Sequence, residues 1–156
     1  MIRLYGRNLK GLRVKNYVPD ARWQSLSLLS RLRSDGSTQA IVYKGGLTGE
    51  LFKTWIRECL LSTLKEGDIV ILDNMSSHKV AGVKELISSV GARIEYLPPY
   101  SSDLNPIDLM WSKVKGYLRN ASKTEIHELT EAAGEGLKQV TKTDALCWCK
   151  HCGYST

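Results

Sequence analysis

The chain has 156 residues, enough for one domain with a real core, and its 42% hydrophobic and 24% charged content is ordinary for a globular protein. Its 22 lysine and arginine residues outnumber 16 acidic ones, and the net charge of +6 favours a polyanionic partner such as nucleic acid. No apolar stretch approaches the roughly 20 residues that span a bilayer and no signal peptide is evident, so we expect a single cytoplasmic domain over 1–156 without membrane contact.

The first third of the chain is expected to hold an irregular basic arm and a β-hairpin. Residues 1–18 combine glycines with arginines and lysines, as in an arm or a ragged hairpin. Alternating side chains over 23–33 predict one strand, and the run 40–44 predicts a second. Because Ser34-Asp35-Gly36 between them is a typical turn sequence, we expect the two strands to pair.

A helix, a strand, a second helix and a further strand are predicted next. Thr48 is a suitable N-cap for the first helix, over whose length apolar residues recur at helical spacing from Phe52 to Leu60. The run 69–72 is short and wholly apolar, which is typical of a strand buried on both faces. The second helix is expected over 83–90, and the further strand over 93–97.

Three more helices are expected in the remainder of the chain. Asn105 is a good N-cap and Pro106 fits the first position of the first of them. Ser122 and Glu125 have the spacing of a capping box, which would open the next. A short terminal helix is closed by Gly153. Two strands followed by alternating helices and strands predict an α/β fold with a partly antiparallel edge.

Asp73 is the first candidate site residue. It directly follows the apolar run 69–72, so it lies at the carboxyl end of a strand, where open α/β sheets place their ligand sites. Asn74 and His78 follow closely. The alternative is that Asp73 and Asn74 only turn the chain, since both residue types favour turns.

Asp108 is the second candidate, as the third residue of the helix that begins at Pro106. With Ser112, Lys115 and Arg119 it forms one flank of that helix, which places an acid at the head of a basic track. Two carboxylates from a strand end and a helix start suit a divalent metal that acts on phosphate esters. The alternatives are a capping carboxylate and a solvated charged face.

The two acidic segments together resemble a family signature. The string ILDNMSSH, which contains Asp73, and the string LPPYSSDLNPID, which contains Asp108 and precedes a tryptophan and a lysine-rich helix, are similar to the DDE/DDD catalytic domain of mariner-like insertion-sequence transposases. The similarity runs from the YGR near the start to the terminal HCGY. It implies an RNase H-like mixed sheet flanked by helices.

The resemblance also implies a reaction and its partners: metal-dependent cleavage and strand transfer of DNA, on transposon ends and target DNA of a bacterial nucleoid. The family's second catalytic aspartate carries over to Asp73 and its third acid to Asp108, so both are expected to bind metal, with two Mg²⁺ or Mn²⁺ ions in a complete site. Asn74 and His78 are accessory candidates. His78 is expected either to orient a phosphate or water or to make a local structural hydrogen bond.

This chain departs from the family pattern at two positions. Bacterial relatives usually have glutamate where this chain has Asp108, whereas mariner itself uses aspartate, so metal binding is retained with a shorter arm. The family usually has proline in place of Ser102, which affects the rigidity of that loop. We interpret Asp103, in the same loop, as a turn residue.

The family's first aspartate is not found in this chain. The resemblance places it on a strand upstream of the YGR, after a helix-turn-helix region, and none of Asp20, Asp35 or Asp68 follows an apolar strand in the right order. That strand is central in an RNase H-like sheet, between the hairpin and the strand 69–72, so its loss leaves unpaired backbone groups. We therefore expect a truncated or split transposase, with little or no DNA cleavage unless an upstream transposase fragment or a homo-oligomer completes it.

Two other functions remain open. One is a non-catalytic nucleic-acid-binding remnant that contacts phosphates through its basic arm and through Lys113, Lys115 and Arg119. The other is a small zinc-binding interaction module. Its ligands would crowd into six residues of the terminal helix: Cys147, Cys149, His151 and Cys152.

Overall fold

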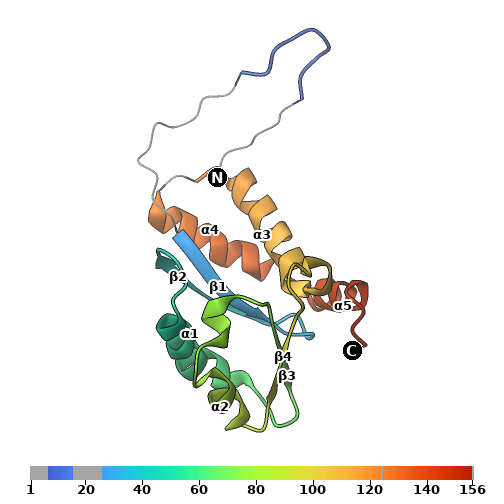
Figure 1. Ribbon diagram of the computed structural model, residues 1–156. Helices are drawn as coiled ribbons and strands as arrows, with labels where there is room; N and C mark the ends of the chain where they lie inside the picture. Colours follow the sequence, from blue (N-terminus) through green and yellow to red (C-terminus); the bar gives the residue numbers. More distant parts are fainter. Residues whose placement is uncertain (1–6, 16–25, 124, 156) are drawn as a thin grey trace.

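The computed structural model describes residues 7–15, 26–123 and 125–155 (Figure 1). Strands β1 (Leu26–Leu32) and β2 (Thr38–Lys44) form an antiparallel hairpin, so the predicted pairing is confirmed. In the turn, the Asp35 carboxylate accepts the Ser37 N–H at 2.7 Å, and Gly36 adopts a φ of +85° that favours glycine. The predicted strand residues 23–25 and half of the basic arm, residues 1–6 and 16–18, lie outside the described residues.

Helix α1 (Gly49–Trp55) begins as expected, because the Thr48 hydroxyl accepts the Leu51 N–H at 3.2 Å. After Trp55 the helix changes pitch. It continues as one π-helical segment, η1 (Ile56–Leu60), and one 3-10 turn, η2 (Leu61–Thr63). The buried side chains of the whole segment still share one face, so the predicted apolar stripe survives the change.

Strands β3 (Ile69–Leu72) and β4 (Arg93–Tyr96) pair in parallel, connected by the 3-10 turn η3 (Ser76–Lys79) and helix α2 (Val83–Ser88). The prediction that the 69–72 strand is buried on both faces is wrong. Ile69 is 48% exposed, and the three residues after it are only half-buried. The reason is that β3 pairs with β4 alone in the described part of the chain, and its other edge faces a cavity.

A short 3-10 turn, η4 (Ser102–Leu104), leads into helices α3 (Pro106–Ala121), α4 (Ile126–Lys138) and α5 (Lys142–His151). The predicted capping box at Ser122 is wrong. Ser122 instead ends α3 in the left-handed conformation, with φ +51°, and donates its N–H to the Leu118 carbonyl, so it serves the reversal toward α4. Gly153 closes α5 as expected, with φ +86°. Over the described ranges no helix is both long and apolar enough to cross a membrane.

The hairpin separates two hydrophobic cores. Because neighbouring strand residues point to opposite faces, Leu29 and Ile41 pack against α1, β3 and α2, whereas Leu28 and Leu32 pack against α3 and α4. Figure 1 shows α3 and α4 on one side of the hairpin and α1 and α2 on the other. The molecule is thus a mixed α/β layer structure in which α3 packs on α4, α5 and β1.

Candidate functional site

Asp73 lies at the carboxyl end of β3 and combines two roles. Its Oδ1 accepts the Met75 N–H at 3.0 Å, which is the turn-forming contact that its residue type favours. Its side chain nevertheless stays 42% exposed and lines a surface hollow. The turn contact therefore fixes the direction of the carboxylate without using up its second oxygen.

His78 is a buried neighbour of Asp73. It lies in η3 with its side chain only 11% exposed, its ring 4.3 Å from the ring of Phe52 (centroid to centroid) and its Nδ1 2.7 Å from Asp73 Oδ1. The contact has the distance of an ion pair but not the angle of a hydrogen bond, and Nδ1 has no other partner. The Tyr96 hydroxyl donates to the His78 carbonyl at 3.0 Å and anchors the turn. This burial favours a positioning role over direct contact with a phosphate.

Asp108 lies in the first turn of α3, and its electrostatic surroundings point to a site. Partial screening from water raises the pKa of its carboxyl group, and the negative charge of Asp73 raises it further, whereas a hydrogen bond with Asn105 and the charge of Lys115 lower it. Asn105 occupies the N-cap position without capping the helix through its side chain. Its amide serves Asp108 instead, a role that the N-cap pattern did not predict.

The two carboxylates share one hollow of about 420 Å³. Its wall consists of Asp73 to Met75, the loop Leu97 to Ser102, Asn105 and Asp108. Tyr100 stands fully exposed at its rim, with a φ of +60° that is unusual for a residue other than glycine. No sequence pattern predicted this exposed aromatic residue.

The donor set of the hollow fits one divalent cation. Mg²⁺ typically takes oxygen ligands, one or two of them protein carboxylates, and keeps waters or phosphate oxygens in its other positions. Asp73 and Asp108 supply two carboxylates, whereas the side-chain oxygen of Asn74, the accessory candidate, accepts a hydrogen bond from the Lys79 ammonium group. Among the described residues, no group of three or more His, Cys, Asp or Glu side chains is arranged to hold a metal.

The three cations proposed to contact DNA differ in their contacts with the rest of the protein. Lys115 and Arg119 are exposed on α3, and Lys115 is near enough to Asp108 to lower its pKa. Lys113 is instead held by α5: its Nζ lies 2.6 Å from Asp144 Oδ2 and donates to the Gln139 carbonyl at 2.7 Å. Lys113 is thus paired with an acid of α5, whereas Lys115 and Arg119 lie on the exposed side of α3, and the DNA contacts of all three stay predictions.

The Asp144 contact leads to a stability prediction. Asp144 also completes a capping box with Thr141, and the Lys113 hydrogen bond, followed by those from Thr141, lowers its pKa to about 2. We expect Asp144→Ala to lower the free energy of unfolding at pH 7 by about 1–2 kcal/mol. Since the folded pKa is depressed, this stabilisation is present above the unfolded pKa of about 3.9 and is lost as pH falls toward 2.

Urea unfolding of the parent and Asp144→Ala proteins at pH 7, 4 and 2.5 measures this contribution. The difference between the two free energies of unfolding should shrink as the pH falls. A difference that is the same at all three pH values would contradict the assignment of the ion pair.

The cysteine cluster does not form a metal site in the described region. Cys147 and His151 are exposed on α5, Cys149 is half-buried, and Cys152 is buried. Burial raises the pKa of the thiols of Cys149 and Cys152, which disfavours the thiolate that zinc requires. The zinc-module interpretation therefore gains no support from the geometry.

Comparison with known proteins identifies the class. The sequence model of the DDE superfamily endonucleases matches residues 1–130, and the chain belongs to that family. Among solved structures, it is similar to the Mos1 mariner paired end complex with Mn, with a TM-score of 0.68 and 12% sequence identity over 96% of this chain. The chain spans about half of that protein, 47% of its length. No curated protein matched.

These comparisons bear on the expectations from sequence. The likeness to the catalytic domain of mariner-like transposases is confirmed, and so is the RNase H-like α/β fold class. The strands and helices that carry Asp73 and Asp108 are the predicted ones, and the fold brings both acids to the same hollow. Their catalytic and metal-binding roles stay predictions.

Proposed function

We propose that this chain carries two of the acidic residues of a mariner-like transposase catalytic domain and that it binds DNA and a divalent metal for strand cleavage and strand transfer. The observation that carries the proposal is the convergence of Asp73 and Asp108 on one hollow at the carboxyl end of β3. The similar mariner structure is a paired end complex with Mn, which supports a divalent ion, Mg²⁺ or Mn²⁺, as the cofactor.

Each residue has a distinct task in this proposal. A bound divalent ion supplies Lewis-acid activation of a phosphodiester and of the attacking water or DNA 3′-hydroxyl. The Met75 N–H orients Asp73, which also lies next to the His78 ring, and a hydrogen bond with Asn105 orients Asp108, so that both would present carboxylate oxygens to an ion in the hollow. Lys115 and Arg119 continue along α3 and would hold the DNA backbone in line with the acids.

The proposal includes low activity for the isolated chain. Among the described residues, the hollow lacks a third acidic ligand. Asp73 and Asp108 alone would therefore not hold two metal ions at the correct spacing. We propose that an upstream transposase fragment, or a second copy, completes the site. A supercoiled-plasmid nicking assay with Mg²⁺ and Mn²⁺ tests this: efficient cleavage by the purified chain would contradict it.

A second candidate function is that of a DNA-binding remnant without catalytic activity. The lack of a third acidic ligand and the exposed cations Lys115 and Arg119 favour it. The variant in which Asp73 and Asp108 are both replaced by Asn separates the two. DNA binding that is equal with and without Mg²⁺ in the parent protein, and unchanged in the double variant, favours the remnant. Metal-dependent binding that the double variant loses favours the catalytic domain.

The basic track gives a prediction about salt dependence. Lys115→Gln and Arg119→Gln are each expected to weaken binding to duplex DNA, since each removes one phosphate contact. Each should also reduce the steepness with which log K falls with log salt by about 1. Lys113→Gln is the matched control, because the structure commits Lys113 to Asp144. Fluorescence anisotropy at several salt concentrations measures the slopes. A Lys113→Gln slope as reduced as the other two would return Lys113 to the DNA contact surface.

A further inference from the structure

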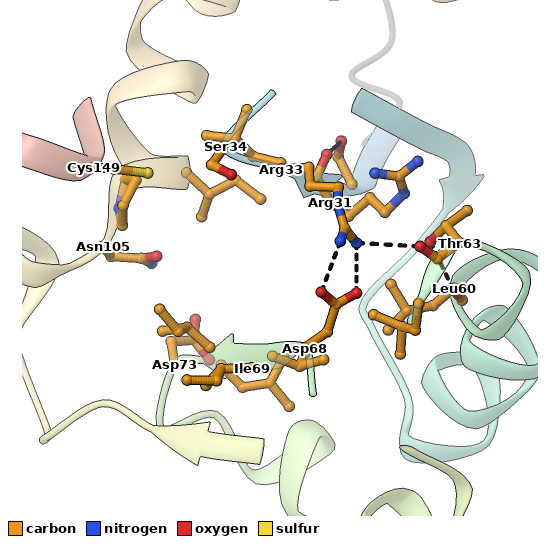
Figure 2. A pocket seen from close by; sticks show the side chains of 18 of the residues that line it. Arg31, Arg33, Ser34, Leu60, Thr63, Asp68, Ile69, Asp73, Asn105 and Cys149 are labelled. Atoms are coloured by element: carbon orange, nitrogen blue, oxygen red, sulfur yellow. Dashed lines mark hydrogen bonds and ion pairs between the residues drawn. The ribbon is translucent and has the colours of Figure 1, made fainter. Parts of the chain in front are cut away.

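Asp73 lies between two cavities of the protein. One is the hollow of about 420 Å³ that it shares with Asp108. The other, of about 470 Å³, lies between β1 and β3, and Figure 2 shows Asp73 at its wall. His78 lines this second cavity together with Phe52, but it is not part of the wall of the acidic hollow. Any influence of His78 on an ion in the hollow would therefore act through Asp73.

His78 is held in place by its ring and by its backbone. The ring is buried, and its centroid lies 4.3 Å from that of Phe52 in α1. The backbone N–H of His78 donates to the Met75 carbonyl at 3.0 Å, and its carbonyl accepts the Tyr96 hydroxyl of β4 at 3.0 Å. A side chain that is fixed in this way can impose an orientation on a more exposed neighbour.

The Nδ1 atom of His78 has one polar neighbour, the carboxylate of Asp73. It is buried and lies 2.7 Å from Asp73 Oδ1, without a well-aligned hydrogen bond to any described group. Because two hydrogen-bond acceptors would repel at this distance, we assign a hydrogen to Nδ1 and treat the carboxylate oxygen as its acceptor. A buried donor without a well-aligned partner destabilises the fold, so packing alone does not account for histidine here. Contacts of this kind are often poorly aligned in the unliganded state of a site and tighten in the complex.

Both contacts of the Asp73 side chain are made by the same oxygen. Oδ1 accepts the Met75 N–H at 3.0 Å and lies beside His78 Nδ1, whereas Oδ2 has no such contact within the described ranges. Rotation of the carboxylate would break both contacts at once, so the group is held with Oδ2 as its free oxygen. A ligand that is already oriented loses less conformational entropy when it binds.

We propose that His78 is the positioning residue of Asp73: its Nδ1 holds Oδ1, so that Oδ2 is presented to a divalent cation in the hollow. This role rests on the proposed function, because it requires Asp73 to be a metal ligand. His78 itself then contacts neither the ion nor a phosphate. It raises the affinity of the site for metal without adding a ligand.

Two variants of His78 separate positioning from packing. His78→Phe keeps an aromatic ring beside Phe52 and removes the poorly paired nitrogen. We therefore expect an unfolding temperature equal to or above that of the parent, but an affinity for Mn²⁺ at least about tenfold lower, as is typical when the partner of a metal ligand is removed.

His78→Asn makes the opposite change. Its side-chain amide lies as many bonds from the backbone as Nδ1 does and can donate to Asp73, but the ring contact is lost. We expect a lower unfolding temperature and an affinity for Mn²⁺ within about threefold of the parent.

Isothermal titration with Mn²⁺ at one fixed pH, and thermal unfolding of the metal-free proteins, measure the two properties. A residue that only packs would give the reverse order, with the affinity following the stability. Parent-like affinity in folded His78→Phe, or a loss in His78→Asn as large as in His78→Phe, would overturn the proposal. His78→Leu replaces His78→Phe if the latter does not fold. If neither folds, retained or lost affinity in His78→Asn decides.

Ser77→Ala is the matched control for a change in the same turn. Ser77 precedes His78 in η3, and its buried hydroxyl also has no hydrogen-bond partner, but it lines neither cavity. Its affinity for Mn²⁺ should equal that of the parent, and a tenfold loss there would show that any disturbance of the turn suffices.

Asp73→Asn distinguishes failure of this inference from failure of the proposed function. Loss of Mn²⁺ binding in Asp73→Asn, with parent-like binding in His78→Phe, would contradict the role of His78 and leave Asp73 as a ligand. Unchanged binding in Asp73→Asn would contradict the proposed metal site, and with it the role of His78.

Discussion

Asp108→Asn is expected to weaken the binding of Mn²⁺ at least about tenfold while leaving the unfolding temperature at pH 7 unchanged or slightly higher. The first effect follows because Asp108 supplies one of the two carboxylates that line the hollow. The second follows from the sign of its pKa shift. Partial screening from water and the charge of Asp73 raise the pKa of Asp108, so ionisation costs more in the folded chain than in the unfolded one.

The pH dependence of this cost is specific. The contribution of Asp108 to the free energy of unfolding is fully present below the unfolded pKa of about 3.9. It is lost as the pH rises through the raised folded pKa, and it stays low at pH 7. Asparagine keeps the shape and accepts a contact from Asn105 without the charge, so the substitution removes the cost. A bound cation reverses the balance by favouring the carboxylate. Both effects together would indicate that Asp108 serves the site and not the stability of the fold.

Asp103→Asn is the matched control, because Asp103 is an exposed residue of η4 that does not line the hollow. It removes the same charge a few residues away. Isothermal titration with Mn²⁺ and thermal unfolding in the absence of metal measure the two properties. Parent-like Mn²⁺ affinity in Asp108→Asn, or an equal loss in Asp103→Asn, would show that Asp108 is not a ligand.

Gly36→Ala is expected to be the most damaging small substitution, with a loss of about 2–4 kcal/mol in the free energy of unfolding. Gly36 has a φ of +85°, which an L side chain adopts at a cost. In addition, a Cβ there would lie 2.5 Å from the Lys142 backbone nitrogen and 2.8 Å from its Cα. Those are backbone atoms at the start of α5, so neither partner can yield by a simple rotamer change.

Gly45→Ala separates the two causes, since Gly45 has a φ of +88° but nothing within 4 Å of an added Cβ. We expect it to lose only the conformational part, about 1–2 kcal/mol. Urea unfolding of the three proteins gives the comparison. Equal losses in the two variants would mean that the hairpin turn does not pack against α5 in solution.

Local features of this chain were readable from sequence. The hairpin follows from an alternating pattern and a turn with glycine, the start of α1 from Thr48, and the end of α5 from Gly153. In each case the deciding interactions lie within a few residues of one another. The candidate acids were also readable, because a strand end and a helix start can be recognised from the segments themselves.

Other features depended on which segments meet in three dimensions. The residue type and spacing of Ser122 suit a capping box, but α3 runs to Ala121 and Ser122 ends that helix. Lys113 resembles its neighbour Lys115 in sequence, and only the docking of α5 commits it to Asp144. The exposure of Ile69 depends on what lies beside β3, since an apolar strand is buried on both faces only when both of its edges and both of its faces have neighbours.

The sequence by itself therefore determined the kinds of elements, their order and the two acids that they carry, because short-range hydrogen bonds and side-chain periodicity decide these. Tertiary structure alone decided that Asp73 and Asp108 share one hollow, that Lys113 is paired with Asp144 of α5, and that a cavity separates β1 from β3. These depend on contacts between residues tens of positions apart, and a local pattern contains no information about which distant surface will cover it.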